Sequence, residues 1–179
     1  MSVHSATLAR EKRRNRPPLK GIENFTMNAP PAVGGALLVY AHPDDESFGN
    51  PGTTALYASR YIPVSLVCFT HGEAGEPNGV CSPEELGNVR ASELRAAADV
   101  LGISRLELWD YPDGGLEGVD DEEAIARLIE TYESIGPGAI VTFSDDGITG
   151  HHDHLTVSKW ATEAFWRLRK KSGGGGPSR

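Results

Sequence analysis

Four short apolar runs stand out along the chain, and more polar stretches with helical periodicity separate them. The runs lie at residues 36–40, 63–69, 105–109 and 139–143. Uninterrupted apolar runs of this length are typical of strands that are covered on both faces, as in a parallel sheet. We therefore expect four buried strands.

The stretches between and after these runs favour helices. Residues 83–101 give the clearest pattern, with apolar positions at helical spacing and Gly102 as a stop signal. Three further helices are expected at 49–60, 120–135 and 153–171. Strand and helix alternate along the whole series, which indicates an α/β fold, a Rossmann-like parallel sheet with flanking helices.

The two ends of the chain differ from this pattern. Residues 1–32 lack periodicity and are rich in Arg, Pro and Asn, so we expect a disordered basic N-terminal arm. Residues 172–179 have the composition of a Gly-rich flexible tail. The α/β domain is thus expected to span residues 33–171.

Charge and composition exclude several classes of protein. The formal net charge of −8 argues against a generic nucleic-acid binder. No apolar run approaches the roughly 18–20 residues that a membrane span requires. The two cysteines suggest no disulfide framework, which favours a cytoplasmic location. A homo-oligomeric state is left open.

The candidate chemistry lies in two clusters that each follow a predicted strand. Residues 41–46 read Ala-His-Pro-Asp-Asp-Glu, and residues 150–154 read Gly-His-His-Asp-His. Ligands of such sheets bind beyond the carboxyl ends of the strands, so the two loops are expected to face one crevice. Helix capping and loop hydrogen bonds are the alternative explanation for either cluster alone. However, four of the six histidines of the chain fall in these two loops, which capping does not explain.

Imidazole and carboxylate groups at one crevice favour a catalytic zinc site. Zinc suits two His and one Asp ligand and leaves a position open for water, although iron or cobalt is compatible with the same ligands. An uncoordinated carboxylate beside the metal can take the water's proton, and a further imidazole can donate to a developing oxyanion. A nucleotide-binding site is disfavoured, because no G-x-G-x-x-G follows the first strand and the carboxylates there would repel a pyrophosphate.

The order of these motifs resembles the PIG-L/LmbE-like deacetylase family, over roughly residues 35–168. Segments 70–73, 90–93 and 112–114 support the resemblance. That family contains zinc N-deacetylases that act on N-acetylglucosamine conjugates. The resemblance implies Zn²⁺ as the cofactor and a small amino-sugar conjugate as the substrate.

The resemblance also implies roles for individual residues. The zinc ligands would be His42, Asp45 and His154. Asp44 would be the general base. His151 would stabilise the oxyanion or act as the acid, and Asp153 would orient or tune it.

Arg90 and Asp113 would contact sugar hydroxyls. Each has a plainer alternative, since Arg90 could form a surface pair with Glu93 and Asp113 could be an ordinary turn residue. Asp153 could in addition cap the last helix. His71 and His152 match no ligand position of the family.

This chain differs from the family at its C-terminal end. Family members usually continue with further strands and helices, whereas a Gly-rich tail follows here, so we expect a fold truncated on this side. The main expectation is a zinc-dependent hydrolase that removes an acetyl group from an N-acetylglucosamine-type or related amide substrate. The alternative is a truncated, non-catalytic metal-binding remnant or interaction module of the same fold.

Overall fold

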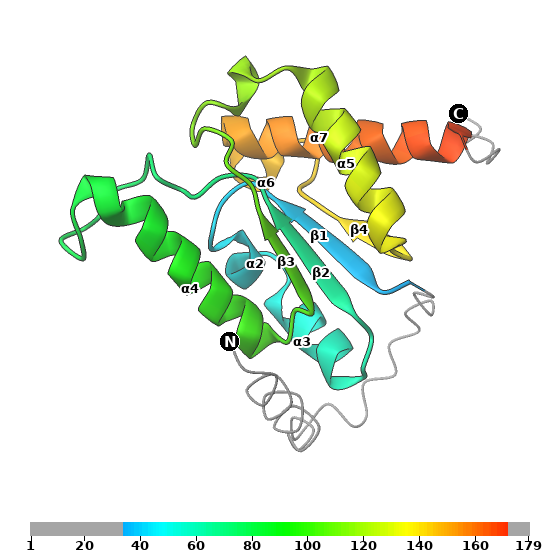
Figure 1. Cartoon of the computed structure of the whole chain (residues 1–179), viewed down its shortest axis with the longest axis horizontal. Helices are drawn as coiled ribbons and strands as arrows, with labels where there is room; N and C mark the ends of the chain where they lie inside the picture. The colour runs from blue at the N-terminus through cyan, green and yellow to red at the C-terminus, as the bar shows by residue number, and fades with distance from the viewer. Residues whose placement is uncertain (1–33, 172–179) are drawn as a thin grey trace. The chain divides into compact units, whose positions relative to one another are not determined.

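A computed structural model describes residues 34–171, and its core is a sheet of four parallel strands with helices on both faces (Figure 1). The strands are β1 (Ala36–Tyr40), β2 (Val64–Cys68), β3 (Arg105–Leu108) and β4 (Ala139–Val141). They lie in the order β3-β2-β1-β4, and every neighbouring pair is parallel. The expected α/β class is confirmed. The predicted arm at 1–32 and tail at 172–179 lie outside the described residues.

The helices largely match the sequence pattern. The four expected ones correspond to α3 (Pro51–Ser59), α4 (Leu86–Leu101), α5 (Asp121–Ile135) and α7 (His152–Lys171). The helix expected at 83–101 begins with a 3₁₀ turn, η1 (Pro83–Glu85). The sequence did not indicate the one-turn helices α2 (Asp45–Phe48) and α6 (Gly147–Gly150), nor the 3₁₀ turn η2 (Leu116–Gly118). None of the helices within residues 34–171 combines the length and apolar character needed to cross a bilayer.

The strand order creates a switch point between β1 and β4. From β1 the chain proceeds through α3 to β2 and through α4 to β3, and it then returns through α5 to the other side of β1. Right-handed crossovers in opposite directions place their helices on opposite faces, and α5 packs against α7 while α3 packs against α4 (Figure 1). The carboxyl ends of β1 and β4 therefore border the crevice in which such folds bind ligands.

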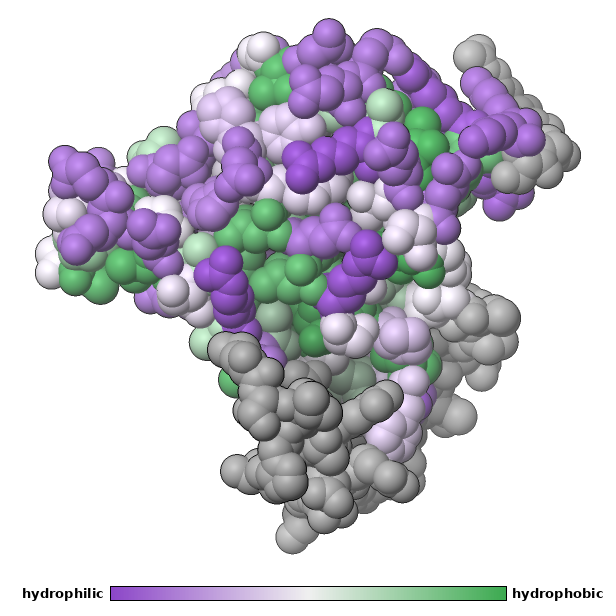
Figure 2. Space-filling view, in the orientation of Figure 1, coloured by the Kyte–Doolittle hydropathy of each residue, from purple (hydrophilic) through white to green (hydrophobic). Residues whose placement is uncertain are grey.

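The core lies around the two central strands. Every residue of β1 and β2 is buried, whereas β3 and β4 at the sheet edges are partly exposed. Full burial of a side chain such as Leu37 contributes roughly 1.5–3 kcal/mol to stability. Figure 2 shows hydrophilic residues over α5 and α7 and apolar residues gathered between α4 and α5, where the edge strand β3 lies. The central strands thus form a rigid base for the loops at their carboxyl ends.

Candidate active site

The two motif loops meet at the switch point and line an open pocket of about 360 Å³. One loop follows β1, and the other follows β4 and enters α7. The pocket is lined by His42, Asp44, Asp45, Ala74, Gly75, Arg90, Asp113, Gly114, His151 and His154. Of the residues expected to form the site, only Asp153 is absent from this lining, because its side chain is buried behind His42.

His42, Asp45 and His154 point donor atoms at one place. His42 Nδ1 lies 3.3 Å from His154 Nε2 and 3.7 Å from Asp45 Oδ2, and His154 Nε2 lies 3.4 Å from Asp45 Oδ1. Two ligands at about 2.0–2.1 Å from a tetrahedral zinc ion are about 3.3–3.4 Å apart. The donor types and their spacing therefore fit a zinc ion.

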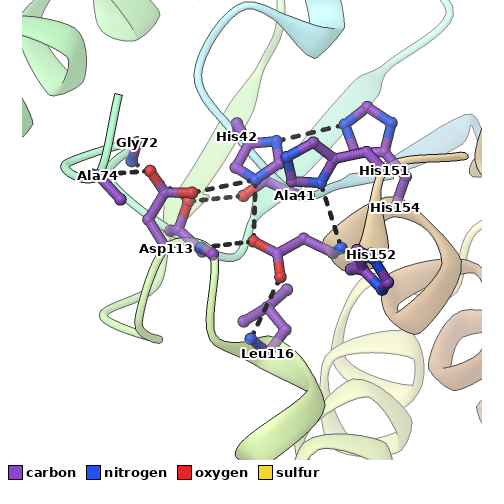
Figure 3. Close-up of polar contacts among 12 residues, drawn as sticks. Ala41, His42, Gly72, Ala74, Asp113, Leu116, His151, His152 and His154 are labelled. Carbon is purple, nitrogen blue, oxygen red and sulfur yellow. Dashed lines mark hydrogen bonds and ion pairs between the residues drawn. The ribbon is translucent and has the colours of Figure 1, made fainter. Parts of the chain in front are cut away.

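The outer nitrogen of each imidazole has an acceptor that fixes its tautomer. His42 Nε2 lies 3.1 Å from both Asp113 Oδ1 and Asp153 Oδ2. Figure 3 shows the side chain of Asp113 directed at the ring of His42. His154 Nδ1 lies 3.1 Å from the carbonyl oxygen of Gly147. With protons on these outer nitrogens, the two facing nitrogens present lone pairs. A proton or a metal ion has to lie between them.

Two further donor groups have ligand spacing, namely His42 with His151 and His154, and His42 with Asp113 and Asp153. In the second of these groups, both oxygens of Asp153 and one of Asp113 already accept backbone amides. Asp153 accepts from the N–H of Gly114 at 2.7 Å and of Leu116 at 3.2 Å, and Asp113 accepts from the N–H of Ala74 at 2.8 Å. We therefore interpret the two carboxylates as a cradle that orients His42.

The cradle has a clear electrostatic effect. Burial lowers the pKa of His42, but the hydrogen bonds to Asp113 and Asp153 and the charge of Asp45 outweigh it and raise this pKa to about 9. Burial raises the pKa of Asp45 to about 6. Burial, reinforced by the charge of His42, lowers the pKa of His154. In the metal-free protein a proton on His42 Nδ1 thus occupies the place that a metal would take.

The raised pKa of His42 predicts that the stability of the metal-free protein falls at alkaline pH. Because the pKa of His42 is raised from 6.5 to about 9, its contribution is complete below pH 6.5 and is lost as the pH rises through about 9. The metal-free protein should lose up to about 3 kcal/mol of its free energy of unfolding over this range. Urea unfolding in a chelator at pH 6.5, 8 and 9.5 measures the loss. Saturating zinc should remove it, because zinc displaces the proton; equal metal-free stabilities at pH 6.5 and 9.5 would contradict the cradle.

Asp44 stands at the N-cap position of α2 but does not act as a cap. Its carboxylate makes no capping bond, and its backbone φ is 110°. The side chain is about half exposed and ion-paired with Arg90, with 2.9 Å between Oδ2 and Nη2. The capping explanation for the adjacent aspartates therefore fails for Asp44, whose carboxylate lines the pocket beside Arg90.

Arg90 reaches the pocket from α4. Its guanidinium donates to the carbonyl oxygens of Gly72 at 2.8 Å and Pro43 at 2.6 Å, besides Asp44. Arg90 therefore connects α4 to two loops, the one after β1 and the one after β2, which is more than the surface pair with Glu93 that the sequence left open. Its contact with a sugar, and that of Asp113, stay predictions.

His151 contacts Asp153 through the backbone rather than through the carboxylate. Its Nδ1 accepts the backbone N–H of Asp153 at 3.2 Å, which leaves the proton of the neutral ring on Nε2. Asp153 thus orients His151 through its amide, whereas its carboxylate holds His42. The ring of His151 lies 4.8 Å from that of His42. His151 can therefore offer an N–H donor beside His42, Asp45 and His154.

Sequence reasoning missed two features of the site, an aromatic stack on His154 and the carbonyl that fixes the tautomer of the same ring. Phe143 stacks on His154 with ring centroids 4.0 Å apart, and Gly147 supplies the carbonyl that fixes the His154 tautomer. Glu46 is buried beneath Asp44 and accepts its N–H. His71 and His152, which matched no ligand position, pair instead with Asp110 and Glu117.

Comparisons with known proteins agree with this geometry. The family model "PIG-L: GlcNAc-PI de-N-acetylase" matches residues 37–165. A 1D-myo-inositol 2-acetamido-2-deoxy-alpha-D-glucopyranoside deacetylase of Salinispora arenicola is 34% identical over 152 residues, which cover 72% of this chain and 49% of the relative. The chain spans about half the length of the curated relatives that it matches.

Two solved structures share the fold. The N,N'-diacetylchitobiose deacetylase of Pyrococcus horikoshii has a TM-score of 0.66 at 23% identity, covering 97% of this chain and 62% of its own. GalB, the 4-carboxy-2-hydroxymuconate hydratase of Pseudomonas putida KT2440, has a TM-score of 0.63 at 29% identity. The match covers 73% of this chain and 55% of the GalB chain. The same fold therefore carries more than one reaction.

Proposed function

The chain belongs to the PIG-L family of GlcNAc-PI de-N-acetylases, and on this premise we propose that it is a zinc-dependent hydrolase that removes the acetyl group from an N-acetylglucosamine-type substrate. The observation that carries the proposal is the convergence of His42 Nδ1, His154 Nε2 and the Asp45 carboxylate, at 3.3–3.7 Å from one another. These three residues would hold the metal. When bound, zinc would supply Lewis acidity, which polarises an amide carbonyl and lowers the pKa of water to about 7.

The residues around the metal ligands would supply the proton acceptor and the hydrogen-bond donor that amide hydrolysis needs. Asp44 accepts a proton from the attacking water, since its carboxylate is half exposed in the pocket and binds no backbone amide of α2. The Nε2–H of His151 donates a hydrogen bond to the oxyanion that develops on the carbonyl oxygen and keeps its proton. The proton that Asp44 has taken passes to the leaving amine, so that the products are acetate and a free amino sugar.

The electrostatics of the pocket favour deacetylation over the hydratase reaction of GalB. Arg90 is the only Arg or Lys among the described residues that line the pocket, and Asp44 already pairs with it. Three further carboxylates belong to the site, namely Asp45, Asp113 and Asp153. With Arg90 and the proposed Zn²⁺ counted, the four carboxylates still leave a formal charge of −1, so a polycarboxylate such as 4-carboxy-2-hydroxymuconate is less favoured here than an uncharged N-acetyl sugar.

The proposal is tested by assaying chelator-treated, zinc-reloaded protein. Release of free amine is measured from the inositol conjugate named for the Salinispora relative and from N,N'-diacetylchitobiose, with hydration of 4-carboxy-2-hydroxymuconate as the counter-assay. We expect amine release that depends on zinc. One zinc per chain with no turnover would favour the metal-binding module instead, and failure to bind zinc would overturn both.

The two cysteines support a cytoplasmic enzyme. Both are free, and Cys68 is buried in β2, where burial raises the pKa of its thiol. A reducing compartment suits unpaired thiols.

A further inference from the structure

Glu46 is a buried carboxylate that the proposed chemistry does not use. Only 2% of the residue is exposed. Its Oε2 accepts the backbone N–H of Asp44 at 3.0 Å, and its Oε1 accepts the hydroxyl of Ser47 at 2.6 Å. Burying a carboxylate is costly, and both of its contacts lie within the loop that carries the candidate base.

Asp44, the partner of Glu46, has an unusual backbone. At φ 110° and ψ −26° it lies outside the regions that residues with a side chain normally occupy. Its carbonyl accepts from the amides of Ser47 at 2.8 Å and Phe48 at 3.0 Å, which opens α2. An N-cap aspartate normally bends its carboxylate back onto such amides. Here the side chain is directed to Arg90 and the pocket.

We propose that Glu46 is a positioning residue that holds Asp44 in this conformation and so presents its carboxylate to the substrate. Strained backbone persists where neighbouring groups over-determine it. Arg90 holds Asp44 from the pocket side through the carboxylate and the preceding carbonyl of Pro43, and Glu46 holds the amide from the buried side. The inference rests on the proposed role of Asp44 as the base.

Two substitutions at position 46 separate the effect of side-chain length from the effect of side-chain charge. Glu46→Gln keeps the length and an acceptor oxygen but removes the charge, so it should retain nearly the full kcat. Glu46→Asp keeps the charge but is one methylene shorter and cannot reach the amide of Asp44. It should lower kcat by about tenfold to a hundredfold, with KM and zinc content unchanged. Should Glu46→Asp not fold, Glu46→Met, which has the length but no acceptor oxygen, takes its place with the same expected result.

Amide hydrogen exchange at Asp44 provides a readout that does not need activity. Its N–H should exchange slowly in the wild type and in Glu46→Gln, and faster in Glu46→Asp. An unchanged kcat and exchange rate in Glu46→Asp would overturn the inference, as would equal losses in both variants, which would assign the effect to charge. If the wild type shows no deacetylation, the proposed function fails, and the exchange rates alone decide whether Glu46 holds Asp44.

Discussion

Asp44→Asn lowers kcat by about three orders of magnitude, in the range that a general base contributes. The amide keeps the shape of the side chain and can still accept a hydrogen bond from Arg90, whose Nη2 lies 2.9 Å from the carboxylate. The three proposed zinc ligands are untouched, so the zinc content should stay near one per chain. What the variant loses is the ability to take a proton from water. Steady-state amine release, with zinc measured on the same sample, checks the prediction.

Asp110→Asn is the matched control for this experiment. Asp110 follows β3, and its side chain is 91% exposed. It pairs with His71, which is not one of the proposed metal ligands. The same chemical change should leave kcat unaltered there. If Asp44→Asn keeps more than about a tenth of the wild-type kcat, Asp44 is not the base, and another group must accept the proton.

His154→Ala should abolish zinc binding in the micromolar range and activity with it. The substitution removes one of three ligands, and loss of even an outer partner of a ligand typically costs 10–100-fold in metal affinity, so we expect a loss of more than about a hundredfold. Zinc should raise the Tm of the wild type by binding only the folded chain, and should no longer do so in the variant. Isothermal titration with zinc and a thermal melt measure the two effects.

His152→Ala tests whether the effect belongs to the site. His152 lies two residues before His154 at the start of the same helix, but its exposed ring pairs with Glu117 on η2. This variant should bind zinc and turn over substrate as the wild type does. Loss of zinc in His152→Ala as well would mean that the start of α7, rather than the imidazole of His154, is what the metal requires.

The apolar runs predicted the sheet well because its central strands are covered on both faces. Residues 36–40 are fully buried in β1, and no polar position interrupts them. The edge strand β4 is shorter than its run, since only 139–141 pair with β1. The one-turn helices α2 and α6 were missed because a single turn has no periodicity to detect.

The sequence located the site but could not predict its internal contacts. Two motifs after two parallel strands are enough to place His42 and His154 at one crevice. The direction of the Asp153 carboxylate depends instead on how α7 packs, and this packing turns it toward His42 rather than toward the neighbouring His151. The pairing of Arg90 with Asp44 joins residues 46 positions apart, and no local pattern encodes it.

The distance along the chain between His42 and His154, 112 residues, has a consequence for biosynthesis. While the ribosome is still making β4, the nascent polypeptide carries only His42 and Asp45 of the three proposed ligands, and the edge of β1 that β4 will cover is open. Two ligands without the third hold a metal weakly. The proposed zinc would therefore bind only after α7 has emerged and docked, so metal loading would report the docking of α7 on the newly made sheet.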